Sequence, residues 1–271
     1  MDQEEALEFA QHLADVSRSI ALRYFRTSLD IRWKEDASPV TIADCEIEST
    51  LRSVIRDRYP DHGIIGEEYD RAPGGRYNWI LDPIDGTKSF IMGNPLFGTL
   101  IGLLDDGKPI AGLVDLPAMG ERWDGTDRRT IFTDGVSNGQ ANVSNCCSIE
   151  AARLYITAPP GADPDEKYAG VETLSRVAAL TRPVCDCYAY GLLASGYCDL
   201  VIEDSLEPCD YLPLVPIING AGGRITDWTG KPLTLNSNSD GRVIAASTER
   251  LLEAAIEALH NSLAAADSAT G

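Results

Sequence analysis

The chain has 271 residues, of which 44% are hydrophobic and 7% aromatic, and its formal net charge is −19. This composition is typical of an ordinary soluble globular protein with a substantial core, and it excludes a disordered chain. The acidic balance also disfavours nucleic acids and anionic membrane surfaces as partners, because both repel a negatively charged protein.

The first part of the chain is typical of two helices separated by a polar loop. Apolar residues recur at helical spacing over residues 4–29, and residues 40–58 form a second helical segment that carries Asp44. The polar stretch at 34–39 between them predicts a mobile loop. The N-terminus lacks the basic start and apolar core of a signal peptide, and no apolar run is long enough to span a bilayer, so we expect a cytoplasmic protein.

Short apolar runs bounded by glycine or proline follow these helices, as is typical of strands. They lie at residues 64–65, 77–81, 98–104 and 111–115. The sequence Asp105-Asp106-Gly107 predicts a hairpin turn between the last two.

The composition turns polar around residues 130–145, and we place a seam there. The seam divides an N-terminal α+β half, residues 1–140, from a C-terminal α/β half, residues 141–271, and the two halves pack as one structural unit. In the second half we expect strands at 154–157, 199–202 and 223–228 and helices at 172–180, 188–195, 212–219 and 249–263. The final residues, 264–271, are expected to fray.

The most informative motif is Asp-Pro-Ile-Asp-Gly-Thr at residues 82–87, directly after one of the expected strands. A strand that runs into Asp82 and turns at Gly86 lets Asp82 and Asp85 converge on one point. This convergence is unfavourable without a cation between the carboxylates. Carboxylate, water and phosphate oxygens are the ligands that Mg²⁺ prefers. A helix that begins at Gly86 or Thr87 would also point free backbone N–H groups at a phosphate.

Taken alone, such a turn is more often a solvated loop or a helix N-cap. The Gly66-Glu67-Glu68 sequence shortly upstream changes that interpretation, because it adds carboxylates to the same region. Together they predict a magnesium site that cuts a phosphate ester. An acidic protein repels such an ester, so bound cations would be needed to receive it.

Three segments resemble, in order, the signatures of the inositol monophosphatase superfamily. They are Gly66-Glu67-Glu68, the run at 79–87, and Pro208-Cys209-Asp210-Tyr211 followed by Gly220-Ala-Gly-Gly223. The resemblance covers nearly the whole chain. It implies an α/β sandwich of five layers in the order αβαβα, of the inositol monophosphatase and fructose bisphosphatase type. It also implies a homodimer that hydrolyses phosphate monoesters with Mg²⁺ and is often inhibited by lithium.

The resemblance implies a set of metal ligands for two or three Mg²⁺ ions, with Mn²⁺ as the alternative ion. These ligands are Glu67, Asp82, the carbonyl of Ile84, Asp85 and Asp210. One departure is visible, since Cys209 stands where the family commonly has tryptophan, and this puts the packing behind Asp210 in question.

The expected mechanism is a direct in-line attack of water on phosphorus without a phospho-enzyme. Glu67 and Thr87 would hold that water, and Asp44 would orient Thr87 by accepting a hydrogen bond from its hydroxyl. Alternation along an extended chain points neighbouring glutamates in opposite directions, so we expect Glu68 to support the site from behind. The expected substrate contacts are Asp85, Gly86, Thr87, Asp186, Glu203 and Asp210.

The segments at 82–102 and 186–191 look most like the histidinol-phosphate phosphatase branch of the superfamily. Histidinol phosphate bears an ammonium and a titratable imidazole, so its pocket should present carboxylates, and Asp186 and Glu203 suit that role. The competing interpretation of Asp186 is an N-cap of the helix at 188–195. The alternative substrates are inositol-1-phosphate, fructose bisphosphate and a 3′-phosphoadenosine compound.

Other readings of the sequence stay open. In haloacid-dehalogenase-type phosphatases an Asp-x-Asp-Gly-Thr aspartate attacks phosphorus, but here Asp82 and Asp85 are three apart. The glycines at 220–223 lack the third glycine of a dinucleotide site, which favours close backbone packing. A non-enzyme alternative is a degenerate relative that serves as a metal-binding module. Its mark would be a missing ligand.

The cysteines and histidines point to structural roles. Seven cysteines suit reduced thiols better than a disulfide framework. Four of the cysteines could instead bind zinc, but their spacings do not match C-x₂-C knuckles. We therefore expect them to pack as small buried hydrophobic residues. The four cysteines concerned are Cys185, Cys187, Cys198 and Cys209. The three histidines are scattered and none is favoured as a catalyst.

Overall fold

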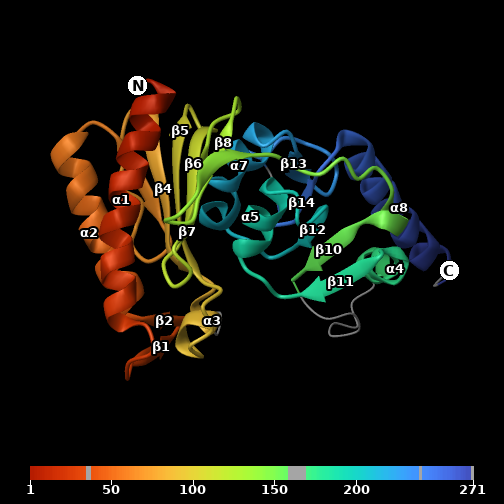
Figure 1. The fold of residues 1–271 in the computed structure, drawn as a ribbon, viewed down its shortest axis with the longest axis horizontal. Helices are drawn as coiled ribbons and strands as arrows, with labels where there is room; N and C mark the ends of the chain where they lie inside the picture. Colours follow the sequence, from red (N-terminus) through yellow and green to blue (C-terminus); the bar gives the residue numbers. More distant parts are fainter. Residues whose placement is uncertain (35–37, 158–168, 238–239, 270–271) are drawn as a thin grey trace.

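The computed structural model describes residues 1–34, 38–157, 169–237 and 240–269. Two sheets alternate with three helical layers, and Figure 1 shows this αβαβα order from α1 and α2 on one side to α4 and α8 on the other. The expected five-layer fold is therefore confirmed. No helix in the described part of the chain is long and apolar enough to cross a membrane.

One of the two outer helical layers consists of α1 (Gln3–Tyr24) and α2 (Ile42–Arg58). Both expected helices are confirmed, with shorter bounds. The chain leaves helical geometry at Phe25, and Arg26 has a φ of 59°, so α1 stops before residue 29. Helix α2 begins after Thr41, whose hydroxyl accepts the Ala43 N–H, as is typical of a helix N-cap.

A small antiparallel pair, β1 (Ile31–Trp33) and β2 (Pro39–Thr41), lies between these helices. The polar loop expected at 34–39 therefore connects two short strands, and residues 35–37 of it lie outside the described residues.

The first sheet has seven strands in the order β3-β4-β5-β6-β7-β8-β9. The four strands expected in this half are confirmed, and so is the hairpin turn, where Asp106 and Gly107 both have positive φ. The bounds are β3 (Gly63–Gly66), β4 (Tyr77–Asp85), β5 (Gly98–Asp105), β6 (Lys108–Leu116), β7 (Glu121–Gly125), β8 (Thr130–Thr133) and β9 (Asn138–Ala141).

The polar segment at 130–145 is not simply a connection, because β8 and β9 occupy much of it. Most of the residues of these two strands are at least partly exposed, which fits the polar sequence of β9. The first sheet ends with Ala141, and the next strand begins at Arg153. The division into halves at residue 140 stays a prediction.

The second sheet has five strands in the order β11-β10-β12-β14-β13. They are β10 (Arg153–Ile156), β11 (Leu180–Pro183), β12 (Leu200–Glu203), β13 (Arg224–Asp227) and β14 (Val243–Ala246). Strands β11 and β14 were not expected. Strand β14 is buried throughout and β11 is largely exposed, so neither shows the alternation that marks a half-buried strand.

Helices cover this sheet on both faces, as Figure 1 shows. They are α4 (Ala169–Val177), α5 (Tyr188–Ala194), α6 (Pro208–Tyr211), α7 (Leu214–Gly220) and α8 (Glu249–Ala269), with a 3₁₀ turn η1 (Ile149–Ala151). Helix α8 continues to Ala269, beyond the expected end at residue 263, and the fraying expected from residue 264 stays a prediction. Alanine has the highest helix propensity, which favours this extension. Residues 270–271 lie outside the described residues.

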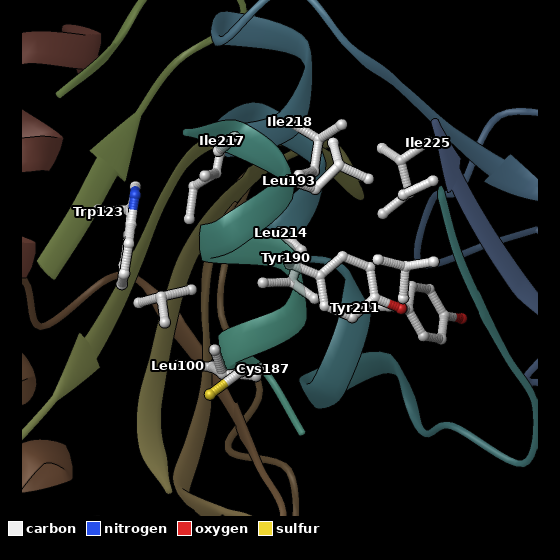
Figure 2. Close-up of a cluster of buried hydrophobic side chains, with 14 of the residues drawn as sticks. Leu100, Trp123, Cys187, Tyr190, Leu193, Tyr211, Leu214, Ile217, Ile218 and Ile225 are labelled. Atoms are coloured by element: carbon white, nitrogen blue, oxygen red, sulfur yellow. The ribbon is translucent and has the colours of Figure 1, made fainter. Parts of the chain in front are cut away.

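The central layer of α5, α6 and α7 joins the two sheets and carries part of the site. Figure 2 shows its buried side chains, among them Trp123 of the first sheet and Tyr190 of α5. Gly220 permits the closest approach, because a Cβ there would lie 2.1 Å from the Thr126 carbonyl oxygen. The glycines near 220 therefore serve backbone packing, as expected, with Gly223 also close to Ala246.

Candidate active site

The site is built around the end of β4, where the strand runs directly into a short helix. The ladder between β4 and β5 is interrupted between Asp82 and Asp85, and the Ile84 N–H donates to Asp82 Oδ1 at 3.0 Å. Gly86 follows with a φ of 80° and caps α3 (Thr87–Ile91). The strand, the turn at Gly86 and the helix start were all expected.

A hollow of about 270 Å³ lies over this turn and brings together segments that are distant in sequence. Acidic side chains come from the ends of β3 and β4, from the start of α5 and from α6. The lining residues are Ser38, Pro39, Glu67, Asp82, Ile84, Asp85, Gly86, Thr87, Lys88, Asp186 and Asp210. All the residues that the motifs implied as metal ligands therefore line one hollow.

The carboxylates in this hollow repel one another. Burial raises the pKa of Asp82 well above its usual range, and the charges of Glu67, Asp85 and Asp210 raise it further. Burial also raises the pKa of Asp85, with the charges of Asp186 and Asp210 adding to the shift. For Asp210, burial and the charge of Glu67 raise the pKa to about 6. A bound cation would relieve this repulsion.

Local donors hold the carboxylates in their present orientations. The Cys187 N–H donates to Asp85 Oδ2 at 2.6 Å, and the Glu207 N–H donates to Asp210 Oδ2 at 2.8 Å. Within the described residues, no three acidic, histidine or cysteine side chains are yet arranged to enclose an ion. The donor set fits a hard divalent cation, because it consists of oxygen atoms and its carboxylates repel one another. Coordination would require the carboxylates to turn toward a common point.

Glu67 and Glu68 differ in the hollows that they line, although the Lys34 ammonium contacts both, so the opposite directions expected from alternation stay a prediction. Glu67 lines the acidic hollow, whereas Glu68 lines an adjoining cavity of about 480 Å³ that Glu67 also borders. Behind Glu68, its N–H donates to the buried Glu48 at 2.7 Å. Lys34 bridges the pair, with its ammonium 2.8 Å from an oxygen of each glutamate. The sequence did not single out Lys34, because it opens a polar run typical of a loop.

Thr87 and Asp44 meet beside the hollow. The Thr87 hydroxyl lies 3.4 Å from Asp44 Oδ1 and 3.0 Å from the Ile84 carbonyl oxygen, so its proton has two acceptors. Asp44 is fully buried rather than solvated, and its Oδ2 accepts from the N–H and the hydroxyl of Thr41 at 2.9 and 2.6 Å. The capping box at the start of α2 thus fixes the carboxylate that faces Thr87.

Asp186 lines the hollow and is not a helix N-cap. Cys187 occupies the N-cap position of α5 and makes no side-chain cap, so that interpretation of Asp186 is wrong. The Asp186 carboxylate instead accepts from the Ser89 hydroxyl at 2.9 Å and sits against Gly86, where a Cβ would approach it to 2.8 Å. Lys88 is a further cation beside it that the sequence did not single out, although it directly follows the Asp-Gly-Thr motif.

Glu203 does not itself line the hollow. It ends β12 and lies behind Asp186 and Asp210, whose charges act on it. Burial is the main reason that its pKa rises to about 7, with those two charges adding to the shift and the neighbouring Tyr190 hydroxyl opposing it.

The raised pKa of Glu203 predicts how stability depends on pH. Because the folded-state pKa of Glu203 lies above its unfolded value, the protonated carboxyl group contributes to the free energy of unfolding. This contribution is complete below pH 4.5 and is lost as the pH rises to about 7. In chelator at pH 8, we therefore expect Glu203→Gln to raise the free energy of unfolding by roughly 1–2 kcal/mol and to flatten its decline from pH 5. Denaturant titrations along the pH series measure this. Glu253→Gln, on the exposed side of α8, is the control, and an equal effect there would contradict the assignment.

Cys209, which stands where the family commonly has tryptophan, does not displace Asp210 from the site. The buried Cys209 thiol lies 3.5 Å from Asp210 Oδ1, within reach of an S–H hydrogen bond. The other three cysteines considered as zinc ligands, Cys185, Cys187 and Cys198, are also free and buried in the central cluster. They pack as small apolar residues, in the way that the sequence favoured.

Comparisons with known proteins agree with this architecture. A family profile described as the inositol monophosphatase family matches residues 2–264. The bifunctional phosphatase IMPL2, chloroplastic, of Arabidopsis thaliana is 44% identical over 257 residues, which are 91% of this chain and 72% of the relative. A histidinol-phosphatase of Mycobacterium tuberculosis is 36% identical over 234 residues, which are 83% of this chain and 86% of the relative.

Among solved structures, an inositol monophosphatase from Zymomonas mobilis superimposes with a TM-score of 0.84 at 39% identity, covering 96% of this chain and 99% of the other. The fold and these matches define the protein as a phosphatase. Within that class, the chain belongs to the inositol monophosphatase family.

Proposed function

We propose that this phosphatase is a Mg²⁺-dependent histidinol-phosphate phosphatase of histidine biosynthesis, which converts L-histidinol phosphate and water to L-histidinol and phosphate. The observation that carries the metal dependence is the hollow in which Glu67, Asp82, Asp85 and Asp210 lie together and repel one another. Two or three Mg²⁺ ions are proposed, with Mn²⁺ as the alternative.

The proposed reaction is direct attack of water on phosphorus, and the chain's residues have separate roles in it. Bound Mg²⁺ would acidify that water and neutralise charge on the phosphate oxygens. Glu67 accepts a hydrogen bond from the water and Thr87 holds it, while Asp44 fixes the Thr87 hydroxyl. The Gly86 backbone can approach the phosphate closely because it has no side chain.

The proposed ligands are those that line the hollow: the carboxylates of Glu67, Asp82, Asp85 and Asp210, and the carbonyl of Ile84. The proposed substrate contacts are Asp85, Gly86, Thr87, Asp186, Glu203 and Asp210.

Two observations support histidinol phosphate as the substrate. Relatives named histidinol-phosphatase from Mycobacterium tuberculosis and Chlorobaculum parvum are 36% and 35% identical to this chain. In addition, Asp186 and Glu203 add negative charge beyond the proposed metal ligands, which suits an ester that carries an ammonium and an imidazole. Inositol-1-phosphate is the second candidate, because the Zymomonas mobilis structure at 39% identity is described as an inositol monophosphatase.

A phosphate-release panel tests the proposal. The substrates are histidinol phosphate, inositol-1-phosphate, fructose bisphosphate and a 3′-phosphoadenosine compound, each assayed with Mg²⁺ and with a chelator. We expect kcat/KM for histidinol phosphate to exceed the others by at least about tenfold, and the chelator to abolish release in every case. Equal or better turnover of another ester would overturn the substrate assignment, and activity that persists in chelator would overturn the metal dependence.

We further propose a cytoplasmic homodimer. The free cysteines of the described residues suit a reducing compartment. The dimer is proposed from the family resemblance, and size-exclusion chromatography with light scattering tests it.

A further inference from the structure

Tyr190 is a buried residue whose hydroxyl makes no regular hydrogen bond, although the Glu203 carboxylate lies near it. Its exposed fraction is 1%, and in the part of the chain that the structure describes its oxygen is one of only two buried side-chain polar atoms left unpaired. A buried hydroxyl without a partner is destabilising, and phenylalanine would fill the same space without that penalty. Packing alone therefore does not explain the hydroxyl.

The surroundings of this hydroxyl connect it to the substrate side of the site. Tyr190 lies on α5, one turn after Asp186, and Figure 2 shows its ring inside the central apolar cluster. Helix α5 packs against β12, which ends at Glu203, and the Glu203 carboxylate is the charged group that acts most strongly on the hydroxyl, ahead of Asp85 and Asp210. Burial and these charges together raise the pKa of Tyr190, so it stays a neutral donor.

The ionised form of Glu203 is disfavoured by its surroundings, so a nearby hydrogen-bond donor would stabilise it. The carboxylate sits at the end of β12, half-buried and close to the negative charges of Asp186 and Asp210. A hydroxyl that turns toward a poorly solvated carboxylate makes a charge-assisted hydrogen bond and favours the ionised form.

We propose that Tyr190 is a positioning residue for specificity, whose hydroxyl orients Glu203 to receive the positive charge of the phosphate ester. The inference rests on the proposed function, since it requires a substrate with an ammonium or imidazolium group. Tyr190 itself touches neither the phosphate nor the proposed metal ligands in this role. It acts through Glu203.

Tyr190→Phe tests the proposal against Tyr188→Phe as the matched control. Tyr188 lies on the same helix, but its hydroxyl faces Glu121 instead. For Tyr190→Phe we expect KM for histidinol phosphate to rise about tenfold with kcat within about twofold of wild type. KM for p-nitrophenyl phosphate, an ester without a cation, should not change, and Tyr188→Phe should leave both values near wild type.

A double-mutant cycle with Glu203→Gln shows whether Tyr190 acts through Glu203. If it does, the double variant should be no worse than Glu203→Gln alone, because the partner of the hydroxyl is already neutral. Additive effects, or equal rises of KM for both esters, would overturn the inference. The melting temperature of Tyr190→Phe should be unchanged or higher, and a large decrease would also count against it.

The wild-type enzyme separates this inference from the proposed function. If wild type shows no preference for histidinol phosphate over esters without a cation, the proposed function fails, and the inference fails with it. If wild type has the preference and Tyr190→Phe retains it in full, only the role of Tyr190 fails.

Discussion

Replacing Asp82 by asparagine should lower kcat at saturating Mg²⁺ by about 100-fold or more, and it should raise the melting temperature of the protein in chelator by a few degrees. Asp82 is 2% exposed and is repelled by Glu67, Asp85 and Asp210. Removing one charge relieves that repulsion but also removes a ligand. The Ile84 N–H can still donate to the asparagine carbonyl, so the turn is retained.

The opposite signs of these two effects make the prediction specific. An ordinary damaging substitution lowers both activity and stability, whereas removal of a ligand from a repelling cluster lowers only activity. Asp105→Asn is the control, because Asp105 lies on the neighbouring strand β5 and pairs with Arg76 at the surface. Turnover is measured by phosphate release, stability by thermal melts in chelator, and Mg²⁺ affinity by calorimetry. A variant that keeps more than about a tenth of wild-type turnover would show that Asp82 is not a ligand.

The sequence predicted those parts of the fold that are determined by the backbone preferences of neighbouring residues. The strand into Asp82, the left-handed turn at Gly86 and the hairpin at Asp106 each follow from residue types with strong backbone preferences. The gathering of carboxylates from four segments that are distant in sequence has no local cause, and the resemblance of the motifs was the main indication of it.

The parts that could not be predicted depend on tertiary contacts. Strand β14 is buried on both faces and so shows no alternation. The ammonium of Lys34 meets Glu67 because β1 and β2 return the chain to the site, and nothing in the local sequence of a polar run indicates this. Similarly, aspartate is a preferred N-cap residue, but Cys187 takes that position at the start of α5 and the Asp186 carboxylate accepts from the Ser89 hydroxyl instead.

A second large loss of activity is expected at one of the two adjacent glutamates, Glu67 and Glu68. Both contact the Lys34 ammonium, but only Glu67 lines the acidic hollow. We therefore expect Glu67→Gln to lower kcat at saturating Mg²⁺ by about 100-fold and Glu68→Gln by less than about fivefold.

These two substitutions are matched controls for each other, since each replaces a carboxylate by an amide of the same shape and leaves Lys34 one carboxylate to pair with. Steady-state kinetics with histidinol phosphate over a Mg²⁺ series separate a lost ligand from a weakened ion pair. Loss of a ligand lowers kcat even when Mg²⁺ is saturating, whereas a loosened Lys34 contact changes only the Mg²⁺ concentration that is required. Similar losses of kcat in both variants would contradict the assignment of different roles to Glu67 and Glu68. Glu68 would then have to act at the reaction centre as well.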